Sequence, residues 1–288
     1  MSAELLKGKP VADAIADEIR SSIARLASLP VPITPGLATV RLGSRSDDIA
    51  YERNIIKRAE SLGLRAKNLS LPETASQDEL LSAISDLARD DSVHGILPFR
   101  PMPPHIKGGA LKQAIPPEKD IDCIGAPSSA SVYDRSLPGF LPCTAEAVIE
   151  LLRFRKIPLE GANVVVLGRS MVVGRALALL LLDENCTVTV CHSKTRGIEA
   201  ISSKADILIC AMGRARKVTA PYIKTGAAVI DVGINDDGNG GICGDADYES
   251  VSQIAGTITP VPGGIGTITN TILIRHAVNA CIAAKRKD

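Results

Sequence analysis

A short glycine turn between an aliphatic run and an apolar helical pattern is the part of the sequence with the clearest chemistry. Residues 164–167 are all aliphatic, Gly168 follows them directly, and Gly174 comes just before the apolar run 176–180. A strand, a turn and a helix in this order present free backbone N–H groups at the start of the helix, where phosphate binds. Gly168 permits the tight turn and Gly174 permits close helix packing, although Ser170 stands where the usual fingerprint has its second glycine. The flanking strand and helix favour a dinucleotide site over the alternative, a purely structural turn.

Polar residues after the next strand pattern bear on which dinucleotide would bind. A site selective for NAD usually places an Asp or Glu near this point, where the carboxylate binds the ribose 2′-hydroxyl. The sequence has no acidic residue between Thr187 and Gly197, but it has Ser193 and Lys194 there, and Arg169 in the first turn. Cationic and hydroxyl side chains suit a 2′-phosphate. We therefore expect NADP to be preferred to NAD.

Length, charge and cysteine content set the class of protein. A chain of 288 residues is long enough for two ordinary domains with real cores. A net charge of +1 gives no reason to expect nucleic acid or an anionic membrane as a partner. No apolar stretch reaches about 18 residues, so we expect no membrane span, and the first residues resemble neither a secretory signal nor a transit peptide. The seven cysteines form no CxxC pair, which favours buried thiols in a reducing compartment, no metal site and a cytoplasmic location.

Helical and strand patterns alternate along the chain, which predicts βαβ units and a parallel sheet. The spacing of apolar residues predicts helices over 11–26, 49–61, 77–88, 145–154, 173–182 and 269–284. Strands are predicted over 36–42, 66–71, 93–97, 163–167, 187–191, 206–210 and 227–232. The proline-rich segment 98–117 is predicted to be an ordered loop, and such loops often carry function. Residues 126–141 are predicted to form an irregular link to a second unit.

Six motifs in order along the chain resemble the methylenetetrahydrofolate dehydrogenase/cyclohydrolase family. They read PEKDID (117–122), LPCT (141–144), GRS followed by VG (168–174), CHSKT (191–195), DVGIN (231–235) and PVPGGIG (260–266). The resemblance implies an α/β protein that forms a homodimer of two-domain subunits, with folate held opposite NADP in a cleft between the domains. It also implies a final helix that returns to the N-terminal domain. We place the folate-binding catalytic domain at 1–144 plus 268–288 and the Rossmann-type NADP-binding domain at 145–267.

The resemblance also assigns roles to individual residues. Tyr51 matches the family tyrosine that packs against folate in the catalytic site, and Asp122 matches the aspartate that hydrogen-bonds the pterin. Gly263 and Gly264 match a loop that closes on the substrate. The residues expected to bind the cofactor are Gly168, Arg169, Ser170, Gly174, Ser193 and Ile234. Taken singly, Tyr51 could be a surface tyrosine, Asp122 a turn former and the glycine pair a helix lead-in. Their joint occurrence in family order favours the functional interpretation.

The sequence departs from the family at three polar positions of the catalytic domain. The family carries a lysine four residues after the tyrosine, as its main acid/base group for hydrolysis, and Ile55 stands there. Lys57 does not replace it, because it lies about 120° from Tyr51 around a helix whereas Ile55 lies roughly 40° away. Phe99 stands where the family has a glutamine that supports the lysine, and Asp48 replaces a serine.

These departures separate the two reactions of the family. Oxidation of the N–CH₂–N bridge moves a hydride to the nicotinamide and removes no proton from the carbon, so orientation and electrostatics can do most of the work. Hydrolysis of the methenyl group needs water to be deprotonated and a ring nitrogen to be protonated, which calls for a positioned acid/base. We therefore expect dehydrogenase activity on tetrahydrofolate one-carbon derivatives, with cyclohydrolase activity weak or absent.

Three alternatives remain open at this point. The chain could be fully bifunctional through a relocated polar group such as Arg100 or Asp48, although arginine stays charged and is a poor proton shuttle. It could also be a catalytically inactive folate- or NADP-binding protein, against which the intact glycine turn argues. A Rossmann dehydrogenase for an unrelated small substrate is the third, against which Tyr51, Asp122 and the Pro-Gly-Gly turn argue together.

Overall fold

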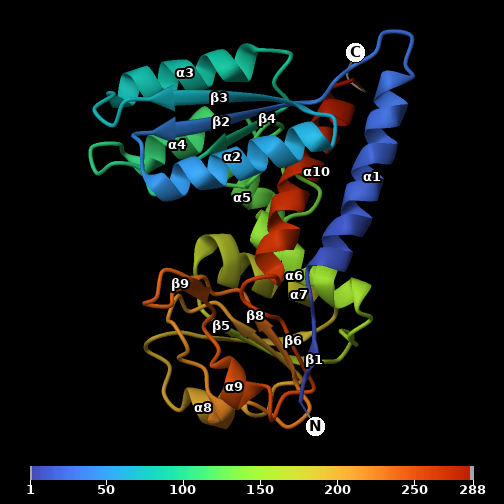
Figure 1. The fold of residues 1–288 in the computed structure, drawn as a ribbon, viewed down its shortest axis with the longest axis vertical. Coiled ribbons are helices and arrows are strands. Elements are labelled where there is room, and N and C mark those ends of the chain that lie inside the picture. Colours follow the sequence, from blue (N-terminus) through green and yellow to red (C-terminus); the bar gives the residue numbers. More distant parts are fainter. Residues whose placement is uncertain (1, 286–288) are drawn as a thin grey trace. The chain divides into compact units, whose positions relative to one another are not determined.

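The chain divides into two compact units, each built around its own parallel sheet (Figure 1). The computed structural model describes residues 2–285. We call residues 14–141 with 270–285 the N-terminal unit, and residues 2–13 with 142–269 the C-terminal unit. This two-unit α/β organisation confirms the predicted fold class. The boundary differs at the start of the chain, because the first residues cluster with the C-terminal unit and not with the folate-binding domain proposed from the sequence.

The N-terminal unit contains a three-stranded parallel sheet in the order β3-β2-β4. Its strands are β2 (Gly36–Leu42), β3 (Arg65–Leu71) and β4 (Gly95–Pro98). Every residue of the central strand β2 is buried, as expected for a parallel strand covered on both faces. Its helices are α2 (Ser46–Ser61), α3 (Gln77–Arg89), α4 (Gly108–Ala114) and α5 (Ala126–Tyr133), together with most of α1 (Lys9–Ala27).

Two of these helices correct the sequence-based prediction. Residues 126–133 form α5, where we expected an irregular link; Pro127 lies in its first turn, where the fixed φ of proline suits a helix. The short helix α4 lies within the segment 98–117 that was predicted to be a loop throughout. The prolines precede and follow α4, so they mark its ends without interrupting it.

The C-terminal unit contains a six-stranded parallel sheet in the order β1-β11-β8-β7-β5-β6. Its strands are β1 (Glu4–Leu5), β5 (Asn163–Leu167), β6 (Thr187–Cys191), β7 (Ile207–Cys210), β8 (Ala228–Asp231) and β11 (Thr257–Ile258). All residues of β7 and β8 are buried, so the aliphatic runs that predicted these strands form the centre of the core.

Short helices and a hairpin complete this unit. They are α6 (Cys143–Phe154), a π-helical turn (Met171–Arg175), α7 (Ala176–Asp183), α8 (Ile198–Ser202), a 3₁₀ turn (Ala220–Tyr222), α9 (Tyr248–Val251) and the antiparallel pair β9 (Asn235–Asp236) and β10 (Ile242–Cys243). The last helix, α10 (Ile265–Lys285), starts in this unit and belongs to the N-terminal unit from Asn270 onward. The predicted return of the final helix to the N-terminal domain is thereby confirmed.

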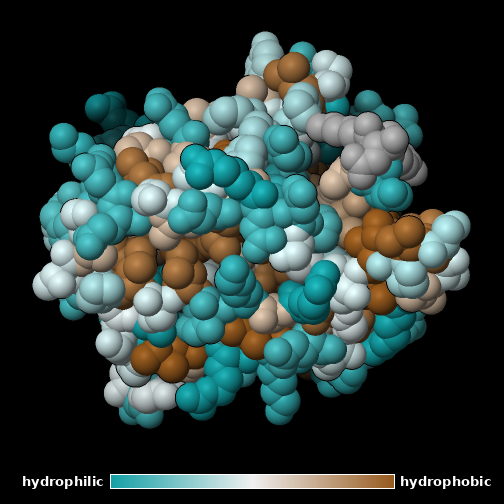
Figure 2. All heavy atoms as spheres, turned by 90° about the horizontal axis from the view of Figure 1, so that it is seen from above, coloured by the Kyte–Doolittle hydropathy of each residue, from teal (hydrophilic) through white to brown (hydrophobic). Residues whose placement is uncertain are grey.

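The surface carries no single dominating apolar area on the face drawn in Figure 2. Hydrophobic residues there lie in separate patches divided by hydrophilic side chains, as is usual because apolar atoms contribute more than half of a folded protein's surface. Within residues 2–285, none of the helices combines the length and the apolar character needed to cross a bilayer.

Candidate functional site

The glycine turn of the C-terminal unit lies at the point where the strand order of the sheet reverses. Strand β5 is flanked by β6 on one side and β7 on the other, and the chain visits β6 first. The N–H of Gly168 donates to the carbonyl of Cys191 at the end of β6 (2.8 Å), and the N–H of Ala211 donates to the carbonyl of Leu167 (2.8 Å). In open α/β sheets, ligands bind outside the carboxyl ends of the strands at such a reversal.

The backbone around this turn leaves no room for a side chain at two positions. Gly168 has φ 134°, and a Cβ added to it would lie 2.0 Å from the carbonyl oxygen of Ala211. A Cβ on Gly174 would lie 2.2 Å from the carbonyl oxygen of Gly168. The turn is therefore drawn tightly against both the helix that follows it and the end of β7, as the fingerprint interpretation requires.

The polar residues expected at the cofactor site follow β5 and β6 at one edge of the sheet. Leu167 is paired with Cys191, so Arg169 and Ser193 come from neighbouring strand ends, and both are exposed. The Ser170 hydroxyl accepts a hydrogen bond from the N–H of Val173 (3.2 Å) and so caps the π-helical turn. The Ser170 hydroxyl thus satisfies one backbone donor of this turn, and contact of Arg169 and Ser193 with a phosphate stays a prediction.

Ile234 and the glycine pair follow the next strands of the same sheet. Ile234 comes three residues after the end of β8 and is 65% exposed. Gly263 has φ 101°, and its carbonyl accepts from the N–H of Gly8 (2.8 Å), while Gly264 is buried one residue before α10. Contact of these residues with a ligand stays a prediction.

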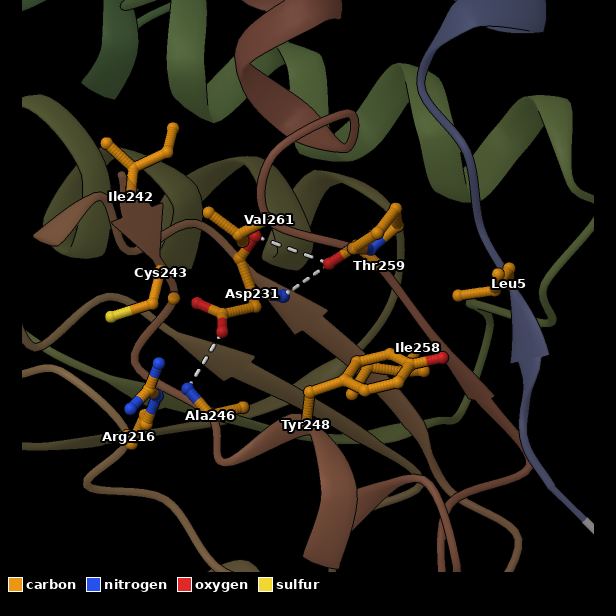
Figure 3. Close-up of a pocket in the computed structure, with 12 residues that line it drawn as sticks. Leu5, Arg216, Asp231, Ile242, Cys243, Ala246, Tyr248, Ile258, Thr259 and Val261 are labelled. Atoms are coloured by element: carbon orange, nitrogen blue, oxygen red, sulfur yellow. Dashed lines mark hydrogen bonds between the residues drawn. The ribbon is translucent and has the colours of Figure 1, made fainter. Parts of the chain in front are cut away.

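A cavity of about 430 Å³ opens next to the carboxyl ends of β8 and β11 (Figure 3). Arg216, Tyr248 and the carboxylate of Asp231 contribute to its lining together with aliphatic side chains, and none of the lining residues belongs to the glycine turn. Asp231 is 3% exposed, and its carboxylate accepts from the backbone N–H groups of Gly233, Asp245 and Ala246 at 2.8–3.0 Å. Burial raises its pKa from 3.8 to about 6, although these three donors act in the opposite direction.

In the N-terminal unit, Tyr51 is the partly exposed member of a small group. Its hydroxyl lies 3.1 Å from Oδ1 of Asn270, to which it donates, and its ring centroid lies 5.5 Å from that of Phe99. Tyr51 is 39% exposed, whereas Phe99 is 6% exposed. The structure thus brings together the tyrosine and the phenylalanine that the sequence analysis singled out, and it adds Asn270 from α10, which sequence reasoning missed because it lies 219 residues away.

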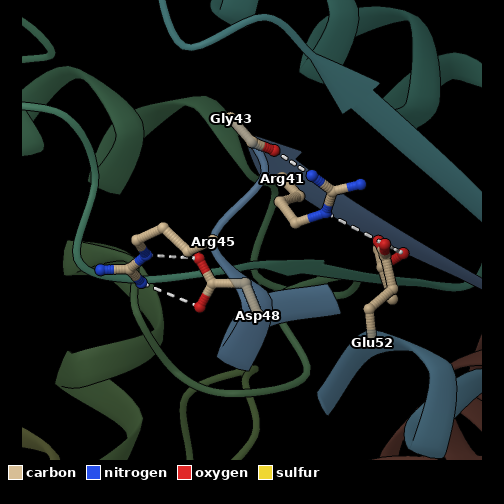
Figure 4. Close-up of polar contacts among 6 residues, drawn as sticks. Arg41, Gly43, Arg45, Asp48 and Glu52 are labelled. Carbon is tan, nitrogen blue, oxygen red and sulfur yellow. Dashed lines mark hydrogen bonds and ion pairs between the residues drawn. The ribbon is translucent and has the colours of Figure 1, made fainter. Parts of the chain in front are cut away.

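The position four residues after Tyr51 holds no group that can carry a proton. Ile55 is 1% exposed and packs on the inner face of α2. The carboxylate of Asp48 is engaged by both Nε and Nη2 of Arg45 (2.7 and 2.8 Å; Figure 4). Lys57 is exposed on another face of the helix. Asp48 and Lys57 are therefore not placed to substitute for a lysine at position 55.

Asp122 forms an ion pair with Arg100. The sequence analysis had considered Arg100 only as a relocated polar group for hydrolysis. Nη2 of Arg100 lies 3.2 Å from Oδ2 of Asp122, and the two side chains are 39% and 25% exposed. A pair that is this accessible is screened by water and contributes little to stability. Its effect is to hold a carboxylate at a defined place next to the loop that carries Phe99.

Three polar side chains anchor α2 to β2 beneath Tyr51, and no local signal in the sequence pointed to them. Thr39 Oγ1 donates to Oε1 of Glu52 (2.8 Å), and Arg41 Nε donates to Oε2 (3.1 Å). Arg41 also donates to the carbonyl of Gly43 (Figure 4). All three side chains are buried, and Glu52 is the neighbour of Tyr51 on α2, so this network fixes the rotation of the helix that presents Tyr51.

The comparisons with known proteins cover the chain almost from end to end. The family model described as "Tetrahydrofolate dehydrogenase/cyclohydrolase, catalytic domain" matches residues 6–122, and the model of its "NAD(P)-binding domain" matches residues 142–286. The "Bifunctional protein FolD" of Clostridioides difficile is 45% identical over 278 residues, which are 96% of this chain and 96% of that protein.

This chain belongs to the tetrahydrofolate dehydrogenase/cyclohydrolase family. Two solved structures of members agree with the fold. The bifunctional FolD enzyme of Campylobacter jejuni superposes with a TM-score of 0.94 at 36% identity, covering 98% of this chain and 100% of that one. The FolD enzyme of Trypanosoma brucei, solved with NADP cofactor and an inhibitor, gives a TM-score of 0.93 at 35% identity and covers 99% of both chains.

Membership of the family gives the glycine turn and the tyrosine group their context. Residues 142–286 match the NAD(P)-binding domain, and they include the turn at the strand reversal and the exposed Arg169 and Ser193. Residues 6–122 match the catalytic domain, which includes Tyr51, Ile55 and Phe99. Across residues 2–285, no cluster of three or more His, Cys, Asp or Glu side chains has the arrangement of a metal site.

The Thr39–Arg41–Glu52 network predicts a large stability change on removal of one partner. We expect Glu52→Gln to lower the free energy of unfolding by about 3 kcal/mol, because the buried Arg41 would lose its counter-charge. The double variant Arg41→Met/Glu52→Leu should recover most of this loss. Urea unfolding measures both, with Glu60→Gln on the exposed face of α2 as the matched control. A loss no larger than that of the control would show that the pair does not anchor the helix.

The raised pKa of Asp231 predicts how stability depends on pH. A carboxyl whose pKa is about 6 in the folded protein and 3.8 in the unfolded chain binds its proton more tightly when folded. Its contribution is therefore fully present below pH 3.8 and lost as the pH rises through about 6, a change of roughly 3 kcal/mol at most. Urea unfolding between pH 4 and 7 should show wild type losing stability relative to Asp231→Asn. Parallel curves for the two proteins would contradict the assignment.

Proposed function

We propose that this enzyme oxidises 5,10-methylenetetrahydrofolate to 5,10-methenyltetrahydrofolate with NADP, and that its cyclohydrolase activity is weak or absent. The weak or absent cyclohydrolase activity is supported by Ile55, which is 1% exposed and lies one helical turn after Tyr51. The oxidation of 5,10-methylenetetrahydrofolate is supported by the match to both family domains and by relatives that are bifunctional FolD enzymes.

Hydride transfer needs from this chain only binding and orientation. When bound, the nicotinamide accepts a hydride from the carbon of the N–CH₂–N bridge, and the bridge becomes an N–CH–N cation with no proton removed. The N–H groups after Gly168 would hold the phosphates that link the two nucleosides, and Arg169 and Ser193 would hold the 2′-phosphate. Tyr51 would pack against the folate ring, and Asp122 would accept from the pterin. Positioned groups of this kind can supply much of the barrier reduction.

Hydrolysis places a demand that the N-terminal unit does not meet. Attack of water on the N–CH–N cation requires a group that takes a proton from water and returns one to a ring nitrogen. The side chains of Ile55 and Phe99, which stand at the family's lysine and glutamine positions, carry no such group. Asp48 is bound on both oxygens by Arg45, and Arg100 is paired with Asp122. The bifunctional reading with a relocated group is thus the less favoured alternative.

The preference for NADP rests on the absence of a carboxylate beyond β6. No Asp or Glu lies between Thr187 and Gly197, and the exposed Arg169 and Ser193 are suited to a 2′-phosphate. The relative from Trypanosoma brucei was solved with NADP. As the resemblance implies, we also propose that the enzyme acts as a homodimer. The net charge and the cysteine usage of the chain support our further proposal of a cytoplasmic location with no nucleic acid or membrane partner.

Two assays on one preparation test the proposed reaction. With 5,10-methylenetetrahydrofolate, we expect NADPH to form; with 5,10-methenyltetrahydrofolate, we expect hydrolysis at close to the uncatalysed rate. The double variant Ile55→Lys/Phe99→Gln should raise hydrolysis at least about tenfold, because general acid–base catalysis contributes on the order of 10²–10⁴. Ile55→Met serves as the control for disturbed packing. Rapid hydrolysis by the unaltered enzyme would refute the loss of cyclohydrolase, and absence of NADPH formation would favour an inactive binding protein.

Replacement of Arg169 tests the choice of cofactor. We expect Arg169→Ala to raise the KM for NADP about tenfold and to leave the KM for NAD nearly unchanged, because one charge-assisted contact to phosphate is lost. Initial rates with the two cofactors give the ratio. Arg175→Ala is the matched control, since Arg175 is exposed in the π-helical turn that follows Arg169 and its guanidinium donates to Sδ of Met171 (3.1 Å). An equal change for both cofactors would show that Arg169 does not read the 2′-phosphate.

A further inference from the structure

Two buried aspartates tie together three loops at the carboxyl edge of the six-stranded sheet. Asp245 is fully buried and Asp231 is 3% exposed. Their hydrogen bonds run to the segment after β7, to the segment after β8, and to the stretch after β10 that carries Asp245 itself. Neither carboxylate is used in the reaction proposed above, so their burial calls for a different explanation.

The Asp245 carboxylate is held by consecutive backbone donors of one loop. It accepts from the N–H groups of Met212, Gly213 (3.0 Å) and Arg214 (2.7 Å). Successive backbone N–H groups that converge in this way form a concave site for an anion. A fourth donor, Nδ2 of Asn235, binds Oδ1 at 2.9 Å. The charge of Asp245 therefore organises the loop after β7 and links it to the segment after β8.

Both segments adjoin residues assigned to the dinucleotide site. The loop after β7 begins with Ala211, whose N–H donates to Leu167 and whose carbonyl oxygen would lie 2.0 Å from a Cβ on Gly168. Asn235 directly follows Ile234, the exposed side chain expected to contact cofactor. A displacement of either segment would move a wall of the site.

Asp231 keeps Asp245 in place from the other side. Its carboxylate accepts the N–H of Asp245 itself (3.0 Å) and that of Ala246 (2.8 Å), the latter visible in Figure 3. It also accepts from Gly233 (2.9 Å), in the segment that leads to Ile234. The two carboxylates thus form one connected network whose partners are backbone N–H groups of the loops and the side-chain amide of Asn235.

We infer that Asp245 is a positioning residue for the dinucleotide, whose buried carboxylate sets the shape of the loop after β7 and couples it to Ile234. The inference rests on the proposed function in one respect, that the dinucleotide binds at the Gly168 edge. It goes beyond it by assigning affinity for the cofactor to a residue that does not touch it. Loss of this carboxylate loosens the loop after β7 and the segment after β8. It therefore lowers the affinity for the dinucleotide and leaves the affinity for the folate substrate unchanged.

Asp206 offers a matched control in the same sheet. Its carboxylate accepts from the N–H of Asn163 (2.9 Å) and from Nζ of Lys224 (2.6 Å), at the amino ends of β5 and β7. It thus joins segments of the same unit at the edge opposite the glycine turn. Asp206→Asn therefore removes a carboxylate contact from the same unit without disturbing the loops that Asp245 holds.

The test compares Asp245→Asn with Asp206→Asn in the full-length enzyme. Asparagine has the size of aspartate but turns an NH₂ toward donors, so the anion site is lost. We expect Asp245→Asn to raise the dissociation constant for NADP and its KM at least about fivefold, with the KM for the folate substrate within about twofold of wild type. Asp206→Asn should leave NADP affinity unchanged. Calorimetric titration with NADP alone and initial rates supply the values.

The outcomes separate this inference from the proposed function. Unaltered NADP affinity in folded Asp245→Asn, or an equal loss in Asp206→Asn, would overturn the positioning role. Failure of the wild-type enzyme to bind NADP would overturn the proposed function instead. If Asp245→Asn does not fold, Asn235→Ala decides, because it removes only the 2.9 Å bond to Oδ1. That variant should raise the NADP dissociation constant at least about twofold, and no change would contradict the inference.

Discussion

The pairing of β5 between β6 and β7 is the constraint on which the C-terminal unit depends. Parallel strands end at a common edge, so this pairing brings the residues after Leu167, Cys191 and Cys210 together. The turn after β5 must then pass within contact distance of Ala211, which only a glycine at 168 allows. Exposed donors, the capped helix start and the loop held by Asp245 all take their positions from that pairing. The backbone pairing of the strands therefore sets the position of the candidate site, and the side chains add donors to it.

In the N-terminal unit, a buried ion pair between Arg41 and Glu52 positions α2. Arg41 and Glu52 are both buried, and taking two charges out of water costs free energy that their mutual attraction only partly offsets. Such a pair contributes less to net stability than to a defined arrangement, because only one rotation of α2 lets Glu52 meet both Thr39 and Arg41. That rotation places Tyr51 outward and Ile55 inward. The chemical character of the unit follows from which side chain stands at each of these positions.

Local patterns in the sequence predicted most of the elements but few of their long-range contacts. Strands 36–42, 163–167 and 187–191 were predicted with their observed bounds, because each is an aliphatic or β-branched run closed by polar residues or glycine. The two-residue strand β1 was missed, since two residues carry no periodicity and its pairing partner is β11, at the other end of the chain. Helix α5 was missed because it has no marked apolar face.

The same limit applied to the site. The glycine turn and Ile55 could be singled out because sequence neighbours give them context. The pairing of Arg100 with Asp122, the contact of Tyr51 with Asn270 and the donors around Asp245 join residues that are 10 to 219 positions apart. Hydrogen bonds of this kind depend on the assembled fold, and a single sequence holds no local signal for them. The family motifs identified the candidate residues, whereas the hydrogen bonds and ion pairs that position them are visible only in the structure.

The two reactions of the family differ in how they depend on the chain, and this difference accounts for how one could be lost alone. In the proposed function, hydride transfer would rely on backbone geometry at the strand reversal, where many contacts act together and no single side chain supplies the chemistry. Hydrolysis relies on one titratable group held in one place. In the proposed function, Ile55 offers no such group, and its apolar side chain is buried on the inner face of α2. The buried ring of Phe99, at the position where the family resemblance implies a glutamine, lies tilted beside the ring of Tyr51, so the surroundings of Ile55 include a second apolar side chain. Nothing in these changes touches the sheet that would hold the dinucleotide, which is why the loss of one activity is compatible with retention of the other.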